Sequence, residues 1–347
     1  MSPARYLTVA ILLLLPLAAS ADPPRRTPAD DNIDRALQFL KRSQESDGSW
    51  RSANTKNPGV TALCVMAFLS AGHVPSEGPY AKTVEDGIRW VLKNQQANGL
   101  ISNDGSLEMY HHGICTLLLA EVVGMTDRKL SEEIRAKLPK AVEVILKAQR
   151  ANGPHKGGWR YRVAETDGDI SVTGWQLMAL RAAKNVGSDV PAEPIDLAIG
   201  YIKRCQSFNG GFMYYPGAQT TVACTGTSIL ALELCGKDLH RCPENLKGGA
   251  YLLKNLPRWG SDHFFYSIYY CSQAMFQLGG NYWEGFRPTL SEQLLRYQNQ
   301  RDGSWLGTDQ GSRIYGPNYC TAMGVLALTV EYRYLPIYQR SEDVQGK

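Results

Sequence analysis

The stretch FLKRSQESDGSW, residues 39–50, decides the fold because its pattern returns along the chain. In each copy an amphipathic run ends in a cationic residue, which Gln, Gly and often an aromatic residue follow. The clear copies cover residues 39–50, 91–100, 145–159, 201–212 and 294–305, with their glycines at Gly48, Gly99, Gly153, Gly210 and Gly303. A weaker sixth copy, LLKNLPRWG, ends at Gly260. Repeats of roughly fifty residues are typical of helical arrays.

Each copy predicts the end of an amphipathic outer helix. Lys or Arg in the last turn suits the negative end of the helix dipole, and Gly accepts the left-handed conformation that ends many helices. The Gln side chain can reach the free carbonyl groups there, and the Trp or Phe ring can cover the junction. We therefore expect a turn after every copy.

A second, more apolar run follows each of these turns. These runs cover residues 60–72, 112–124, 172–183, 224–236, 268–280 and 318–330. They are apolar on nearly every side, as buried helices are, whereas the first set has one apolar stripe. The sequence thus predicts an all-α (α/α)6 toroid of six helical hairpins, with buried inner helices inside an outer ring. An open superhelix is the alternative architecture.

Residues 1–21 have the order of a secretory signal, with a charged start, a short apolar run and a small-x-small site. We therefore expect a cleaved signal peptide, a Pro-rich linker over 22–30, the toroid over 31–334 and a flexible tail over 335–347. The protein is then secreted, or held in the periplasm or cell envelope. No later run is long and apolar enough to predict a membrane span.

The composition excludes some classes of protein. Hydrophobic residues make up 44% of the chain and the net charge is +4, as in an ordinary globular protein. No long Lys/Arg run marks a nucleic-acid surface. Of the eight cysteines, most lie in apolar helical runs and are expected to be free. Cys235 and Cys242, which flank a short loop, form a disulfide or stay free with equal odds.

The Gln…Asp-Gly-Ser-Trp copies at Gln44 to Trp50 and Gln298 to Trp305 resemble the QW motifs of squalene and terpenoid cyclases. The hairpin period resembles both those cyclases and the β subunits of protein prenyltransferases. This resemblance to the α/α-toroid superfamily covers almost the whole mature chain. Because both families hold an isoprenoid in the centre of the ring, it implies an apolar cavity and an isoprenoid-like ligand.

The catalytic motifs of these families are incomplete in this chain. The resemblance implies a cyclase proton donor in the middle of an Asp-x-Asp-Asp-Thr run, and the matching run, Asp169 to Thr173, has Ser171 at that position. The zinc-binding Tyr-His pair of the prenyltransferases has its match near Tyr266, where Ser267 replaces the His. There is no Asp-x-Cys motif. We expect neither ordinary cyclisation nor zinc activation, and no cofactor.

The richest loop of the sequence is GPHKGGWRYRVAETDGDIS, which precedes an inner helix. It offers Trp159, Arg160 and Tyr161 as ligand-binding residues. Asp167 and Asp169 lie two apart just before the helix and are candidates for acid–base work. The competing interpretation, which we favour slightly, is that one carboxylate caps the helix and the other lies in a turn.

Tyr110, His111 and His112 open the second inner helix. Adjacent histidines diverge on a helix, so one should face the cavity and the other a neighbouring helix. We take His111 as a catalytic candidate and His112, with Tyr110, as ligand-binding. No third residue has the spacing of a metal ligand, so no metal is expected.

Many aromatic residues cluster at or just before the starts of inner helices. Those taken as candidate ligand contacts are Tyr214, Tyr215, Tyr266, Tyr269, Tyr315 and Tyr319. Tyrosine rings have apolar faces and polar tips, so this rim suits an isoprenoid or a stacked sugar, while core packing is an equal alternative.

Three functions follow from these observations. The first is a secreted repeat protein that binds or modifies an isoprenoid-like apolar ligand in a central cavity, and any enzyme activity would then be of transferase or cyclase type. The second is a non-catalytic binding scaffold in the envelope, suggested by the incomplete catalytic motifs. The third is a carbohydrate-active toroid that uses the Asp167 and Asp169 loop, by analogy of fold.

Overall fold

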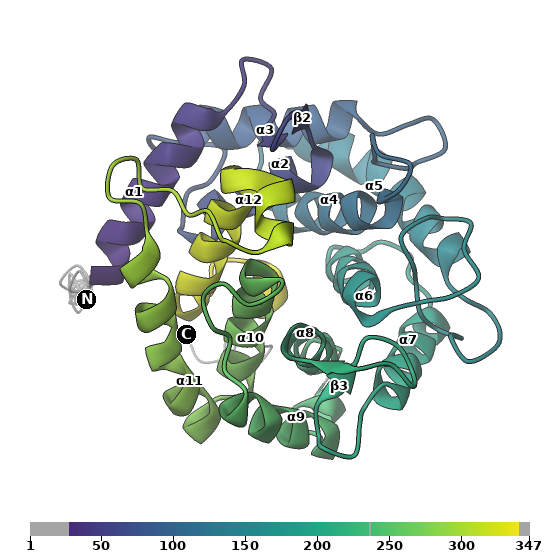
Figure 1. The fold of residues 1–347 in the computed structure, drawn as a ribbon. Coiled ribbons are helices and arrows are strands. Elements are labelled where there is room, and N and C mark those ends of the chain that lie inside the picture. The colour runs from purple at the N-terminus through teal and green to yellow at the C-terminus, as the bar shows by residue number, and fades with distance from the viewer. Residues whose placement is uncertain (1–27, 236, 340–347) are drawn as a thin grey trace, which may run out of the picture.

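The computed structural model describes residues 28–235 and 237–339 of the chain. Figure 1 shows helices arranged as a ring within a ring. The outer helices are α1 (Pro28–Ser43), α3 (Ala81–Lys93), α5 (Arg128–Ala148), α7 (Ala192–Arg204), α9 (Pro243–Lys254) and α11 (Gly280–Gln293). The inner helices are α2 (Pro58–Ser70), α4 (Glu108–Val122), α6 (Ile170–Asn185), α8 (Val222–Glu233), α10 (Phe264–Leu278) and α12 (Gln310–Leu328).

The inner helices form a closed ring. Each contacts the next along the chain, and α12 returns to contact α2. They are buried on almost every side, as α2 shows, in which every residue from Pro58 to Ser70 is buried. The predicted all-α toroid is therefore confirmed, and the open superhelix is wrong.

The outer helices bury one face against the inner ring. In α1 the side chains of Ile33, Leu37 and Leu40 are nearly inaccessible, whereas Asp31 and Lys41 face solvent. Burying such an apolar stripe is what holds an amphipathic helix in place, since short helices are marginal alone.

Short elements fill the connections. Strand β1 (Arg51–Ser52) pairs with β2 (Thr55–Lys56), and β3 (Phe212–Met213) pairs with β4 (Thr220–Thr221), both antiparallel. The 3-10 helices are η1 (Lys237–Leu239), η2 (Leu295–Tyr297), η3 (Val330–Tyr332) and η4 (Pro336–Tyr338). Helix α12 bends at Gly316, whose φ of 79° interrupts the helical backbone.

The glutamine of the repeat joins neighbouring outer helices. The Gln44 amide donates to the carbonyl of Gly48 in its own turn and to that of Thr83 in α3. The same pair of bonds recurs at Gln95 to Gly99 and Lys137, Gln149 to Gly157 and Pro194, Gln206 to Gly210 and Glu244, and Gln298 to Gly303 and Asn32. Since Asn32 lies in α1, the Gln298 bond closes the outer ring.

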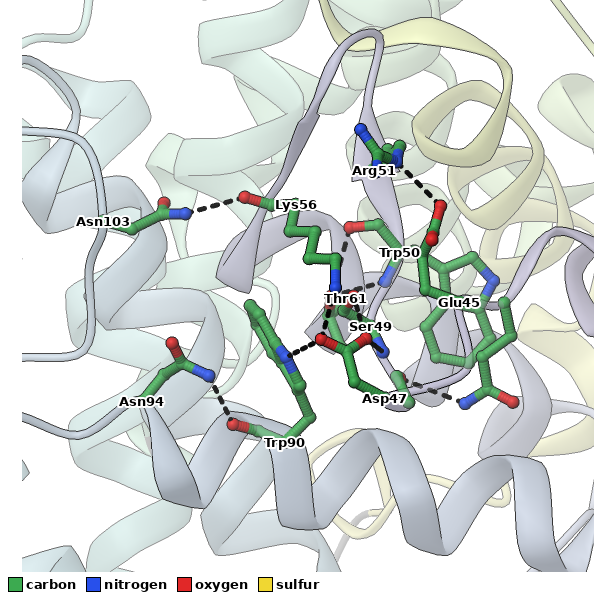
Figure 2. A network of polar contacts seen from close by, with 12 residues as sticks. Glu45, Asp47, Ser49, Trp50, Arg51, Lys56, Thr61, Trp90, Asn94 and Asn103 are labelled. Carbon is green, nitrogen blue, oxygen red and sulfur yellow. Dashed lines mark hydrogen bonds and ion pairs between the residues drawn. The ribbon is translucent and has the colours of Figure 1, made fainter.

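Figure 2 shows the first of these turns at close range. Asp47 accepts hydrogen bonds from the backbone and hydroxyl of Ser49, from the Lys56 ammonium and from the Trp90 indole of α3. The Trp50 indole is buried and donates to the carbonyl of Leu40 in the last turn of α1. The Asp-Gly-Ser-Trp segment therefore fastens a helix end, its turn and the next outer helix together.

The glycine prediction needs correction in two respects. Helix α1 ends at Ser43, so Gly48 belongs to the turn beyond the helix and not to its cap. In the third copy Gly157, not Gly153, has the equivalent place: an added Cβ at Gly157 would lie 2.0 Å from the carbonyl oxygen of Leu197 in α7, but at Gly153 it would meet nothing within 4 Å. The longer loop of this copy misled the alignment.

The boundary predictions hold in part. The expected signal over 1–21 lies outside the described residues, as do most of the expected linker and the end of the expected tail. Helix α1 already begins at Pro28, inside the expected linker. The start of the expected tail is not loose, because Leu335, Ile337 and Tyr338 are buried against the inner ring.

Two further features bear on the earlier expectations. Cys235 and Cys242 are both free thiols in the structure. Between residues 28 and 339, residue 236 apart, no helix combines the length and hydropathy that a bilayer crossing requires.

Candidate functional site

The starts of the inner helices surround a central cavity with two adjoining compartments. The inner compartment measures about 180 Å³ and the outer one about 850 Å³. Tyr110, Tyr161, His263 and Tyr266 line both and mark the passage between them. The outer volume lies in the range of about 300–1,000 Å³ that is usual for small-molecule sites.

The inner compartment has an apolar floor. Leu63 of α2, Ile114 of α4, Trp175 of α6 and Met323 of α12 all line it from one to two turns below the helix starts. Polar side chains lie nearer to the helix starts: Asn57, His111, His263, Asp309, Ser312 and Tyr315. The compartment is thus apolar at depth and polar towards its mouth.

The outer compartment is mainly polar. Its wall includes the start of α8, strand β4 and the loop before α10. The polar side chains that line it are Tyr110, Tyr161, Ser171, Tyr214, Tyr215, Gln219, Thr220, Thr221, Tyr251, Arg258, Ser261, Asp262, His263, Tyr266 and Ser267. Such a wall can hold the hydroxyl or charged group of a ligand.

Arg160 organises the tyrosines of this wall. Its guanidinium donates to the Tyr214 hydroxyl at 2.9 Å, and the hydroxyls of Tyr214 and Tyr161 share a short hydrogen bond. The guanidinium also lies over the Tyr161 ring, 4.3 Å from its centre. Because a planar cation both donates and stacks, it fixes the two phenols in one arrangement.

Asp169 is the N-cap of α6 and is fully buried. Its Oδ1 accepts from the Val172 amide at 3.0 Å and from the Ser171 hydroxyl at 2.5 Å, while its Oδ2 accepts from Arg160 at 3.0 Å. Burial raises the pKa of the Asp169 carboxyl, against the opposing effect of these donors. The capping interpretation is confirmed, and Asp169 reaches the cavity through Ser171.

Asp167 has a different environment from Asp169. Its carboxylate lies 3.4 Å from Arg160 Nε, and its side chain is 42% exposed. The two carboxylates therefore share one guanidinium from opposite sides, one dry and one wet. They do not face a common substrate position as a pair of acid–base groups would.

His111 faces the cavity, but both of its ring nitrogens have partners. The Asn57 side chain is oriented by its own cap bond to Val60, so its amide donates to His111 Nε2 at 2.9 Å. The opposite nitrogen, Nδ1, then donates to the Ser102 hydroxyl at 3.2 Å. Burial lowers the pKa of His111 to about 4. A neutral imidazole held in this way is a poor general base.

His112 turns away from the cavity, and we withdraw it as a ligand-binding residue. Its Nδ1 accepts from the Ile101 amide at 3.1 Å, and its Nε2 donates to the Ala141 carbonyl in α5 at 2.9 Å. The expectation that the two adjacent histidines face different ways is thus met. Trp159 is withdrawn for the same reason, because its buried indole donates to Ile145 at the end of α5.

The tyrosine predictions divide by helix face. Those that line the cavity are Tyr110, Tyr161, Tyr214, Tyr215, Tyr266, Tyr315 and Tyr319. Tyr269 lies instead behind the cavity wall, where it stacks on Trp175 at 5.8 Å between ring centres and bonds to Tyr338. It supports the floor and is not placed to contact a ligand.

Several polar cavity residues escaped the sequence predictions. Asp309 caps the start of α12, accepts from Ser312 at 2.5 Å and lines the inner compartment. Asn57 caps α2 and holds His111. Their common signal is an Asn or Asp just before a buried run, and this signal could have located the rim of the cavity.

The structure contains no ready metal site among the residues it describes. No group of three or more His, Cys, Asp or Glu side chains converges in the two described segments. Ser267, at the position where the prenyltransferase resemblance implies a zinc-binding His, lines the outer compartment beside Tyr266. The donor set on the page therefore does not fit a zinc ion.

The sequence matches one family model over most of its length. This model, the prenyltransferase alpha-alpha toroid domain, matches residues 4–105 and 82–261. No curated protein matches the chain.

Solved structures share the fold at low sequence identity. An inactive variant of an α-1,6-mannanase from Salegentibacter sp., in complex with α-1,6-mannotriose, has a TM-score of 0.66 at 10% identity over 88% of this chain and 99% of that chain. The type II terpene cyclase MstE from Scytonema, with its product merosterolic acid A, has 0.60 at 16% over 89% and 98%. Candida albicans protein geranylgeranyltransferase-I, complexed with GGPP, has 0.54 at 14% over 90% and 97%. At these identities the likeness concerns the fold.

Proposed function

Because the chain belongs to the prenyltransferase alpha-alpha toroid family, we propose that its ring binds a small amphipathic molecule with an isoprenoid-like apolar part. The apolar part occupies the inner compartment and the polar group lies in the outer one. Solved structures of the same fold from a terpene cyclase and a geranylgeranyltransferase hold ligands of isoprenoid type.

The apolar floor of the inner compartment is the observation that carries this proposal. Leu63, Ile114, Trp175 and Met323 come from four different helices and meet around one space. Removing apolar ligand surface from water in such a space contributes about 25 cal/mol per Å². A sugar, with hydroxyls on every side, would leave those groups without partners there.

The central experiment measures binding of geranylgeraniol by quenching of tryptophan fluorescence, since Trp175 lines the compartment. Ile114→Phe adds bulk to the compartment, so we expect its affinity to fall at least about tenfold, the effect of roughly 1.4 kcal/mol. The matched control is Ile199→Phe, on outer helix α7, which should bind as the wild type does. Equal affinity in the two variants, or no binding by the wild type, would contradict the proposal.

A carbohydrate ligand is the second candidate, favoured by the outer compartment. Its lining is rich in phenol and hydroxyl groups, and the ring of Tyr215 is 40% exposed, as a sugar-stacking surface would be. The fold is also that of an α-1,6-mannanase. Isothermal titration with α-1,6-mannotriose decides this candidate: Tyr215→Ala should abolish the heat of binding, while Tyr297→Ala, an equally exposed tyrosine, should not.

We also propose export from the cytoplasm, on the signal-like order of residues 1–21. Amino-terminal sequencing of the protein from its native source tests this, with a mature start just after Ala21 as the expected result. An intact Met1 would overturn it.

A further inference from the structure

Three polar groups run in a line from the cavity into the wall of the ring. The Tyr110 hydroxyl, at the passage between the compartments, lies 2.5 Å from the Ser171 hydroxyl. The Ser171 hydroxyl in turn donates to Asp169 Oδ1 at 2.5 Å. Since a serine has one hydrogen to donate, Tyr110 must be the donor to Ser171 while Asp169 is ionised. The line therefore starts at a cavity phenol and ends at a buried carboxylate.

The wall holds this line in place. The Tyr266 hydroxyl donates to the Ser171 carbonyl at 3.0 Å, and the Tyr110 ring stacks on Tyr161 with 5.7 Å between ring centres. Asp169 is held as the cap of α6. Proton transfer along hydrogen bonds needs short, fixed contacts, and each link here has a separate support.

The far end of the line can accept a proton without stranding a charge. Arg160 pairs with Asp169 at 3.0 Å and also with the solvent-exposed Asp167 at 3.4 Å. When Asp169 becomes neutral, the guanidinium keeps Asp167 as its partner. Burial raises the pKa of Asp169 towards that of a weaker acid, which helps it to hold a proton. The other titratable groups facing this region are Tyr161, Tyr214 and Tyr266.

We propose that Tyr110, Ser171 and Asp169 form a proton relay, and that the ligand carries a weakly acidic hydroxyl, phenolic or enolic, against the Tyr110 oxygen. The ligand O–H bond breaks as its proton joins the Tyr110 oxygen. The phenol proton of Tyr110 passes to Ser171, and that of Ser171 passes to Asp169. Tyr110 and Ser171 are neutral before and after, and the reverse shift returns the proton to the ligand, so no co-reactant is required.

This inference rests on the proposed function, because the ligand occupies the same cavity, and it narrows the ligand class. A saturated alcohol is too weak an acid to give its proton to a carboxylate, whereas a phenol or enol lies much closer in acidity. The ligand is thus an isoprenoid-like chain joined to an acidic hydroxyl.

The test follows Asp169 directly by carbon NMR of protein labelled at the aspartate carboxyls, with the signal assigned through Asp169→Asn. The probes are 4-geranylphenol and its methyl ether, which share one apolar shape and differ in the hydroxyl. In the wild type the phenol should move the Asp169 signal towards its protonated position, and the ether should not. In Ser171→Ala the phenol should still quench tryptophan fluorescence, but the Asp169 signal should stay in place.

A titration without ligand gives an independent result. Tyr110→Phe removes a donor two bonds along the line and should raise the apparent pKa of Asp169 by about half to one pH unit, the worth of one neutral hydrogen bond. Tyr315→Phe, on the same cavity but outside the line, should leave it unchanged.

Each outcome decides something different. Equal signals with the phenol and the ether, or a full response in Ser171→Ala, would overturn the relay while leaving ligand binding intact. Failure of both probes to bind the wild type would overturn the proposed function and the ligand class. In that case an unchanged Asp169 titration in Tyr110→Phe would also remove the relay.

Discussion

One position of the repeat works as a tie between each turn and the inner helix that follows. Thr61, Thr173, Thr225 and Thr321 each accept a hydrogen bond from the backbone amide of the buried Trp or Phe that ends the turn before them. In the second copy His112 takes this place and accepts from Ile101. A histidine whose equivalents are threonines of purely structural use is itself structural.

Gly157 offers the sharpest test of packing between outer helices. In Gly157→Ala the new methyl group would lie 2.0 Å from the Leu197 carbonyl oxygen, so the loop or α7 must move. We expect the free energy of unfolding to fall by about 3 kcal/mol, near the upper end for single substitutions. Urea denaturation measures this.

Gly153→Ala is the control for that substitution. It has a positive φ of 71° but open space around it, so it should cost about 1 kcal/mol, the price of the backbone conformation alone. Equal losses in the two variants would show that the contact with α7 does not matter.

The sequence located the rim of the cavity better than its individual contacts. Tyr110 and Tyr266 could be predicted, because a residue at an inner-helix start has few places to go except the mouth. His112 and Tyr269 could not, since which face of a fully apolar helix points inward leaves no trace in hydropathy. Asp309 was missed because a capping Asp and a cavity Asp look alike in sequence.

At the scale of elements, η4 supports the far side of the cavity floor. The Ile337 amide donates to the buried carboxyl of Glu121 at 3.0 Å, and Tyr338 bonds to Tyr269, which stacks on the floor residue Trp175. The segment after α12 is therefore part of the ring, although its composition resembles a loose tail.

Glu121 makes this support sensitive to pH. Burial raises its pKa from 4.5 to about 8. The folded state therefore favours the protonated carboxyl, and stability falls as the pH rises from about 4.5 to about 8. We expect unfolding measured at pH 5.5 and 8.5 to show a loss of a few kcal/mol in the wild type, and a clearly smaller loss in Glu121→Gln.

Glu77→Gln, at an exposed position, serves as the control for this pH dependence and should follow the wild type. A wild type and a Glu121→Gln variant with the same pH profile would place the sensitivity elsewhere in the molecule.

At the scale of the whole molecule, the ring closes through one glutamine. Gln298 is buried and donates to Asn32 in α1 as well as to Gly303. Gln298→Ala leaves both carbonyls without this partner, so we expect a loss of about 2–3 kcal/mol and faster hydrogen exchange in the amides of α1.

The matched variant is Gln206→Ala, which breaks the equivalent bonds to Gly210 and Glu244. It should cost a similar free energy but leave the exchange of α1 unchanged. If α1 exchanges alike in both variants, closure does not depend on this residue.

The toroid itself was within reach of the sequence because a repeat states one local structure many times. The periodic Gln and Trp residues predict the outer helix ends, and the apolar runs predict the inner helices. The compartments were not, since they depend on how Ile114 and Met323, far apart in the chain, meet at the centre.

Ring closure also sets the order in which the protein can be completed. Helix α1 is synthesised first, yet it packs against α12 and η2, which are synthesised last. The apolar stripe of Ile33, Leu37 and Leu40 therefore stays uncovered for most of the time on the ribosome. A chain released early would display that stripe and be recognised by chaperones or proteases, so the closure at α1 marks a finished molecule.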